Sequence, residues 1–246
     1  VKFVGDDPTG AELALINPKV SGTITLANNA QTFGGTAAQM KAAFTGGLEG
    51  TQTGNVTISD TSGTITATTL TDITGQTNGT VTAAASDITI EGNTTQLTAA
   101  LVTTETNAVV ANGKVTITDT GNVAATVLSA IGNSTGGTVT ATGALTITGT
   151  TEEITNALVT ESKLVVASNE SAAVKFVESN PTGAELALIN PKVSGTITLA
   201  NNAQVFTGTA DQMKAAFTGG LAGTQTGAVT ISDTSGTITA TTLTDI

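Results

Sequence analysis

Apolar and polar residues alternate in short runs along most of this chain. Clear examples are Val56-Thr-Ile-Ser-Asp60, Val115-Thr-Ile-Thr-Asp119 and Val229-Thr-Ile-Ser-Asp233. A period of two with β-branched residues is typical of a strand with one buried face. We therefore expect a strand at each run, then a turn. An apolar segment with helical spacing follows each turn, at Ala67–Ile73, Ala124–Ile131 and Ala240–Ile246.

A second kind of segment begins with Thr-Val-Thr or Thr-Ile-Thr. It starts at Thr23, Thr80, Thr138 and Thr196, and two copies add a second β-like run at Asp87–Ile90 and Ala144–Ile147. Each copy continues into a Thr or Asn that is followed three residues later by Gln or Glu. This is the capping-box pattern, in which two side chains bind the first amides of a helix. The four boxes are Thr36/Gln39, Asn93/Gln96, Thr150/Glu153 and Thr209/Gln212.

The boxes predict short helices, such as Gln39–Phe44, Gln96–Val102 and Glu153–Val159. Diverged copies of the first kind of segment begin at Val1 and Val174. They read as a strand followed by a helix that Pro18 or Pro191 ends, because proline cannot continue a helix.

The two kinds of segment are half-units that alternate along the chain, about 23–25 and 32–35 residues long, and a pair of them repeats every 55–59 residues. A longer repeat lies above this one, because residues 1–73 and 174–246 align at an offset of 173 and differ at only 8 positions. We expect residues 1–173 to form one long repeat of about three units, and residues 174–246 to start the next. On this interpretation the chain is a fragment of a longer array.

A half-unit such as Val56–Gly79 has too few apolar anchors to offset the entropy of ordering its own backbone. Stacked copies solve this problem, because each strand then pairs on both edges. The predicted fold is an elongated, β-rich α/β solenoid with short parallel strands and short capped helices. The longer, second half-unit has room for the extra strand. A string of small β-sandwich modules is the alternative.

Charge and composition narrow the functional classes. The net charge is −11, from 19 acidic residues against 8 Lys and no Arg, so a row of phosphates is an improbable partner. No apolar run approaches the roughly 18 residues of a membrane span. Cys, His, Trp and Tyr are absent, and Thr makes up about a fifth of the chain. An enzyme without His, Cys or Arg is improbable, and we predict no catalytic residues.

Two motifs resemble catalytic sites. Gly132-Asn-Ser134-Thr-Gly136 has the spacing of a hydrolase nucleophile elbow, but no His is present to take the serine proton. The acid pairs Asp6/Asp7 and Glu152/Glu153 consist of neighbouring residues, which do not face each other across a cleft as glycosidase carboxylates do. Glu152 and Glu153 are better explained as helix-cap residues.

Two further patterns indicate binding. Asp60, Asp119 and Asp233 occupy equivalent corners, where they either bind calcium or form Asx-turns. The pairs Thr23/Thr25, Thr80/Thr82, Thr138/Thr140 and Thr196/Thr198 place two hydroxyls on one face, opposite Ile24, Val81, Val139 and Ile197. Stacked pairs would resemble the ordered hydroxyls of β-solenoid ice-binding proteins. Exposed Thr is otherwise an ordinary strand residue.

Glycosylation signals of the form Asn-x-Ser/Thr occur throughout this Thr-rich chain and are expected from composition. They lie at Asn55, Asn78, Asn93, Asn133 and Asn169.

The segments Val115-Thr-Ile-Thr-Asp-Thr-Gly121, Gly137-Thr-Val-Thr-Ala-Thr142 and Leu145-Thr-Ile-Thr-Gly-Thr150 carry a family resemblance. The chain resembles giant Thr-, Gly- and Ala-rich tandem-repeat surface proteins of marine bacteria, cyanobacteria especially. The resemblance implies an extracellular or cell-surface location and a role in adhesion, coating or filament formation. It assigns no functional residue.

These observations predict a non-enzymatic extracellular structural repeat protein that assembles with copies of itself into a filament, surface layer or adhesive coat. No cofactor is expected, with calcium as the exception to test. The alternative is a repeat binding module, either with an ice-binding Thr-x-Thr face or as a glycan- or calcium-binding adhesin.

Overall fold

The computed structural model describes residues 1–103, 107–160, 164–166, 172–178 and 180–246. These residues form two compact units, and we describe each by itself. Unit 1 holds residues 1–117 and 133–139, and unit 2 holds residues 118–132 and 140–246.

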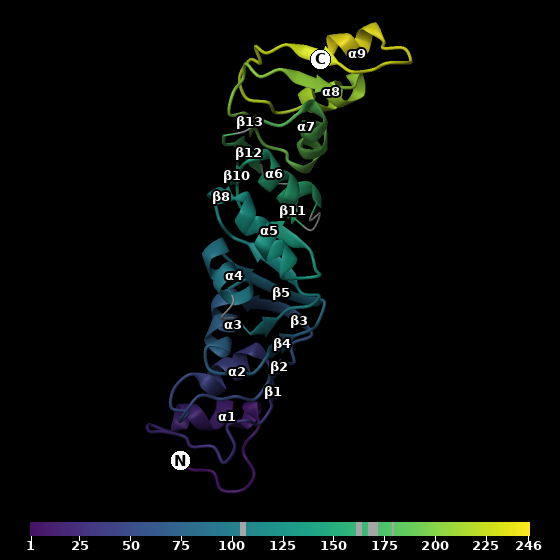
Figure 1. Cartoon of the computed structure of the whole chain (residues 1–246). Helices are drawn as coiled ribbons and strands as arrows, with labels where there is room; N and C mark the ends of the chain where they lie inside the picture. The colour runs from purple at the N-terminus through teal and green to yellow at the C-terminus, as the bar shows by residue number, and fades with distance from the viewer. Residues whose placement is uncertain (104–106, 161–163, 167–171, 179) are drawn as a thin grey trace. The chain divides into compact units, whose positions relative to one another are not determined.

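Short helices and short strands alternate along the described chain (Figure 1). The α-helices are α1 Gly10–Ile16, α2 Ala37–Phe44, α3 Ala67–Thr74, α4 Thr94–Leu101, α5 Ala125–Asn133, α6 Thr151–Thr155, α7 Gly183–Ile189, α8 Ala210–Phe217 and α9 Ala240–Thr244. Single 3₁₀ turns follow α1 at Asn17–Lys19 and α7 at Asn190–Lys192, and a π-helical turn follows α6 at Asn156–Thr160.

The strands are two to six residues long. They are β1 Phe33–Gly35, β2 Val56–Ile58, β3 Ser62–Thr66, β4 Val81–Ala83, β5 Asp87–Gly92, β6 Ala108–Val109, β7 Lys114–Ile117, β8 Gly121–Ala124, β9 Val139–Ala141, β10 Leu145–Gly149, β11 Leu164–Val166, β12 Ala173–Phe176, β13 Ile197–Thr198, β14 Phe206–Gly208 and β15 Val229–Ile231.

Unit 1 contains two parallel sheets, ordered β1-β2-β4-β6 and β3-β5-β7. Paired residues lie 23 to 27 positions apart, as in Phe33↔Val56 and Val81↔Ala108. We call the stretch between two such partners a coil. Because parallel neighbours need a crossover connection, each coil carries its helix on the return path. Helices α1 to α4 accordingly pack one on the next (Figure 1).

The same arrangement holds in unit 2. One parallel sheet has the order β8-β10-β12-β13, and β14 pairs with β15. Helix α7 packs on α6, α8 on α7 and α9 on α8. The prediction of parallel strands alternating with short helices is therefore confirmed. Small β-sandwiches would need antiparallel pairs, whereas every strand pairing described within these units is parallel.

The inward side chains of successive strands stack in rows. One row in unit 1 runs through Phe33, Val56 and Val81, and another through Ile65, Ile90 and Val115. All six side chains are buried. Each strand thus covers the apolar residues of its neighbour, as expected for sheets whose inner face is continuous.

The four predicted capping boxes are all formed, at the N-termini of α2, α4, α6 and α8. Sequence reasoning missed two more, Thr9/Glu12 on α1 and Thr182/Glu185 on α7. Both match the same four-residue pattern, but a Pro precedes the Thr in place of the Gly that marked the others.

Two strand assignments were wrong. The first half-unit was expected to hold one strand, but it holds two, because β3 and β8 each precede a helix. The segment Ser62–Thr66 has the composition of a turn, and Ile65 is its single buried residue. Conversely, the strand expected at Val1–Val4 is reduced to an isolated bridge between Lys2 and Thr25.

Some corners allow only glycine because the backbones of two coils touch. A Cβ on Gly79 would lie 2.2 Å from the Gly54 carbonyl oxygen, and one on Gly54 would lie 1.6 Å from the Gln31 carbonyl oxygen. In unit 2, Gly195 stands against the Ala172 carbonyl in the same way. These glycines set the coil-to-coil spacing.

The Gly79→Ala variant should be destabilised by about 1–3 kcal/mol, the usual cost of an added group in filled space. The control is Gly34→Ala, because a Cβ on Gly34 meets open space and the equivalent residue of the second copy is Thr207. Urea unfolding measures both. Equal stability of Gly79→Ala and Gly34→Ala would contradict the close approach.

The hydrogen bonds of Glu12 predict that the N-terminus of α1 is sensitive to acid. Its carboxylate accepts from the Thr9 amide and from the Thr9 hydroxyl, each at 2.8 Å. The amide first, and then the hydroxyl, lower the pKa of Glu12 below its ordinary value. A lowered folded-state pKa gives a contribution to stability that is present above the unfolded pKa. It is lost as the pH falls through the folded pKa.

Replacing Glu12 with Gln should reduce the loss of stability on acidification while leaving the box in place, since Gln39 plays this part in α2. The reverse exchange, Gln39→Glu, should add acid sensitivity. The measurement is the urea midpoint as a function of pH below neutrality. The interpretation fails if both variants follow the parent curve.

Candidate functional site

The Thr pairs face outward, as predicted. Ile24, Val81, Val139 and Ile197 on the opposite side of each pair are fully buried. However, the predicted pairs are not neighbours in the described ladders. Thr82 stands between Thr57 and Val109, Thr25 stands beside Lys2, and Thr198 stands beside Lys175.

In unit 1, threonines other than the predicted pairs lie side by side on neighbouring strands and form short rows of hydroxyl groups. Thr57 of β2 is paired with Thr82 of β4, and Thr64 of β3 with Thr89 of β5. The second row then meets Lys114 of β7. The outer face therefore mixes hydroxyls with apolar and charged groups.

The corner aspartates bind a helix of the neighbouring coil. Asp60 Oδ2 accepts from the Ala37 amide at 2.6 Å, and Asp233 Oδ2 accepts from the Ala210 amide at 2.7 Å. These are the first amides of α2 and α8, which have no partner within their own helix. Asp60 and Asp233 each cap a helix whose first amide lies 23 positions earlier in the chain, and this contact takes the place of the Asx-turn interpretation. Asp119 lies between β7 and β8.

One member of each acid pair is used in the framework. The two carboxylate oxygens of Asp7 accept from the Ala27 and Asn28 amides, both at 2.6 Å. Glu153 completes the box of α6, and Glu152 lies in the same first turn. Within the described part of the chain, no group of three or more acidic residues is placed to hold a metal ion.

The Ser134 motif does not have the geometry of a nucleophile elbow. An elbow joins a strand to a following helix, whereas Ser134 comes directly after the end of α5. The adjacent Thr135 is buried, and its hydroxyl donates to the Gly113 carbonyl and accepts from the Gly137 amide. This corner joins two coils of unit 1.

Two asparagines that the sequence did not single out, Asn17 and Asn190, cap the C-terminal ends of helices in a neighbouring coil. Asn17 Nδ2 donates to the carbonyls of Ala43 and Thr45 at 3.0 and 2.7 Å, at the C-terminal end of α2. Asn190 does the same for α8 through Ala215 and Thr218. Both asparagines directly precede the proline that predicts the end of the helix, in the pairs Asn17-Pro18 and Asn190-Pro191.

Four of the five Asn-x-Ser/Thr asparagines lie among the described residues, and the amide of one of them, Asn78, donates to the Gln52 carbonyl at 2.9 Å. The Asn55 side chain accepts from the Thr80 amide at 2.9 Å, and Asn93 is the N-cap of α4. Asn133 is the last residue of α5. Asn169 lies outside the described residues.

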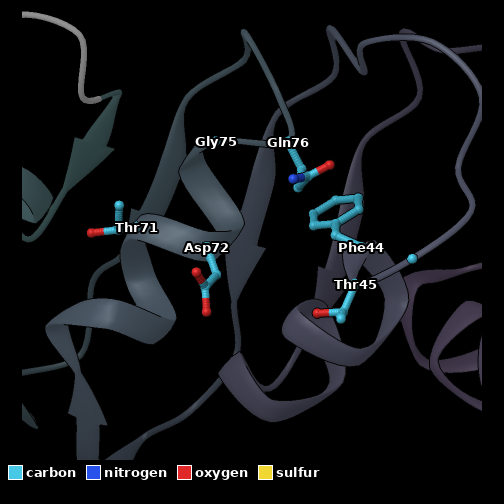
Figure 2. A pocket seen from close by; sticks show the side chains of 7 residues that line it. Phe44, Thr45, Thr71, Asp72, Gly75 and Gln76 are labelled. Carbon is cyan, nitrogen blue, oxygen red and sulfur yellow. The ribbon is translucent and has the colours of Figure 1, made fainter.

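An open hollow of about 460 Å³ lies in unit 1 between the C-terminal end of α2 and the second half of α3. Figure 2 shows Asp72 of α3 on one side and Phe44 and Thr45 on the other. Asp72 is paired with Lys41 at 2.8 Å, and Phe44 packs edge-on against Phe33. The charged group that lines this hollow is thus held in an ion pair with Lys41.

The equivalent ion pair of unit 2 joins Lys214 and Asp245 at 2.8 Å. The hydrogen bond that Lys214 Nζ donates to the Asp245 carboxylate, together with the charge of Asp245, raises the pKa of Lys214. Lys214 is on α8 and Asp245 directly follows α9, so this pair also links neighbouring coils. Of the acidic residues singled out from the sequence, Asp7, Asp60 and Asp233 bind backbone amides of a neighbouring coil, whereas Glu153 caps its own helix.

The Asp60→Ala variant should lose about 1 kcal/mol of stability, the usual cost of a lost helix cap. Asp60→Asn retains an acceptor and should lose less. Calorimetric melting with and without calcium measures both effects, and calcium should shift the parent and the variants equally. A calcium stabilisation that disappears in Asp60→Asn would restore the calcium interpretation.

Among the described residues, no helix has the length and apolar character needed to cross a membrane. Comparison with protein-family models, with curated proteins and with solved structures finds no match to the chain.

Proposed function

We propose that this chain forms an α/β solenoid and serves as a non-enzymatic structural protein outside the cell. Its coils bind one another within the chain and between chains, and so build a filament, surface layer or adhesive coat. No catalytic residue is part of this proposal.

The proposal is supported by the groups that the polar side chains bind. Asp7, Asn17 and Asp60 each bind backbone groups 20 to 28 residues away, on the next coil. Asn107 binds the Thr77 carbonyl, 30 residues away, and the Gly79 carbonyl. In binding sites and enzymes, Asp and Asn side chains bind ligands. Here their hydrogen bonds join one coil to another.

The copies support the proposal further. Asp7 is replaced by Asn180 in the second copy, and Asn180 still accepts from the Ala200 amide at 2.8 Å. The Phe33/Phe44 contact recurs as Phe206/Phe217, with ring centroids 5.1 and 5.0 Å apart. The two copies therefore keep one contact between neighbouring coils and one aromatic contact within a coil.

An extracellular location is proposed from the acidic charge of −11 and from the composition. An acidic surface resists non-specific association and suits exposure to salt water. The copies of this chain would be its main partners.

A repeat binding module is the second candidate, because Thr57 lies beside Thr82 and Thr64 beside Thr89. Such hydroxyl rows would have to order water or bind glycan. Thermal hysteresis or glycan binding by the purified chain, lost on replacing Thr57 and Thr82 with Lys, would favour this candidate.

Assembly is the test of the main proposal. Sedimentation velocity and negative-stain microscopy should show oligomers or filaments that increase with protein concentration. Gly34→Ala should assemble as the parent does, while Gly79→Ala should assemble less, because stacking is impaired. A compact monomer at every concentration, salt and calcium level would refute the proposal.

A further inference from the structure

The chain contains two Asn-Gly pairs, Asn78-Gly79 and Asn112-Gly113, and both lie in unit 1. Glycine has no side chain to shield its backbone nitrogen, so this nitrogen can approach the amide carbon of the preceding asparagine side chain. The approach requires a free backbone N–H and a side chain that can turn toward it. Both asparagines are exposed to solvent. The two pairs therefore differ only in how hydrogen bonds hold them.

The Asn78-Gly79 pair is held on both sides. The Gly79 amide donates to the Thr77 hydroxyl at 3.0 Å, and this hydroxyl donates to the Gly54 carbonyl at 2.7 Å. The Asn78 amide donates to the Gln52 carbonyl at 2.9 Å. The Gly79 nitrogen must give up its hydrogen bond before it can react, and a hydrogen bond of this kind stabilises the unreacted arrangement.

The Asn112-Gly113 pair lacks that hydroxyl. Ala111 stands two residues before Gly113, at the place that Thr77 has before Gly79. Among the described residues, neither the Gly113 amide nor the Asn112 side chain has a hydrogen-bond partner. The next coil presents Gly136 beside Asn112, and only an added Cβ on Gly136 would come within 3.4 Å of Asn112 Oδ1. The nitrogen and the side chain that must meet are thus both free.

We propose that Asn112 is a site of spontaneous covalent modification, at which the side-chain amide is lost and the backbone rearranges. The Gly113 nitrogen gives its proton to hydroxide and bonds to Asn112 Cγ. The bond from Cγ to Nδ2 then breaks, and the nitrogen takes a proton from water and leaves as ammonia. Water opens the resulting ring. Opening at Cγ gives aspartate, and opening at the backbone carbonyl gives isoaspartate, in which the chain runs through the former side chain.

The isoaspartate product changes a contact between coils, because it lengthens the backbone between two anchored carbonyls. The Ala111 carbonyl accepts from the Gly136 amide at 2.8 Å, and the Gly113 carbonyl accepts from the Thr135 hydroxyl. The space between these coils is filled, since a Cβ on Gly137 would lie 2.4 Å from the Gly113 carbonyl oxygen. The modified corner therefore loses at least one of the two hydrogen bonds, and the stacking at this corner weakens.

Peptide mapping of the folded chain after incubation at mildly alkaline pH tests the proposal. Cleavage after Glu places Asn78 in the peptide 50–91 and Asn112 in the peptide 106–152. Mass spectrometry then measures the loss of ammonia and gain of water in each. Asn112 should convert about tenfold faster than Asn78, because tenfold in rate corresponds to ~1.4 kcal/mol, the net contribution of one hydrogen bond.

The controls separate the fold from the local sequence. In concentrated urea the two pairs should convert at similar rates, because the hydrogen bonds of the fold are gone. The Ala111→Thr variant supplies a hydroxyl at the place of Thr77 and should slow conversion at Asn112. The Asn112→Gln variant should show no conversion at this position on the same time scale, because the longer side chain forms the ring far more slowly.

Equal conversion of Asn78 and Asn112 in the folded chain, or faster conversion of Asn78, would overturn the proposal. Hydrogen exchange of the Gly136 amide should be faster in the aged parent chain than in the aged Asn112→Gln variant. Unchanged exchange despite conversion would overturn the effect on the corner. None of these measurements depends on filament formation, so the outcome is independent of the proposed function.

Discussion

Parallel pairing between one coil and the next is the interaction on which the rest of the structure depends. A strand of three residues, such as β2, makes too few contacts to persist alone, and it is ordered because β1 and β4 lie on its two edges. The same pairing stacks Phe33, Val56 and Val81 in one buried row. Where a neighbour is missing, the strand is missing too, as residues 235–239 show against the identical β3.

Residues at the turns between strands and helices allow neighbouring coils to stack closely. Glycines such as Gly54 and Gly79 let two backbones approach, because any side chain would meet a carbonyl oxygen. Asp60 and Asn17 then satisfy opposite ends of α2, one through an amide and the other through carbonyls. Short helices leave many end groups unpaired relative to their length, so caps supplied by neighbouring coils matter more here than in long helices.

A framework of this kind uses many of its polar groups to hold itself together, and this use of polar groups is what supports the structural role that we propose. Its acidic and amide side chains face carbonyls and amides of the next coil.

The sequence by itself determined the short-range features. The four capping boxes were readable because each lies within four residues, and the inward positions of Val56, Ile58 and Val81 follow from a period of two. Tertiary structure decided what depends on groups 20 to 30 residues away. Nothing local in Asp60 shows that it caps α2, and nothing local distinguishes Ser62–Thr66, which is a strand, from residues 235–239, which are not. The physical reason is that a backbone becomes a strand only when another backbone supplies the hydrogen bonds.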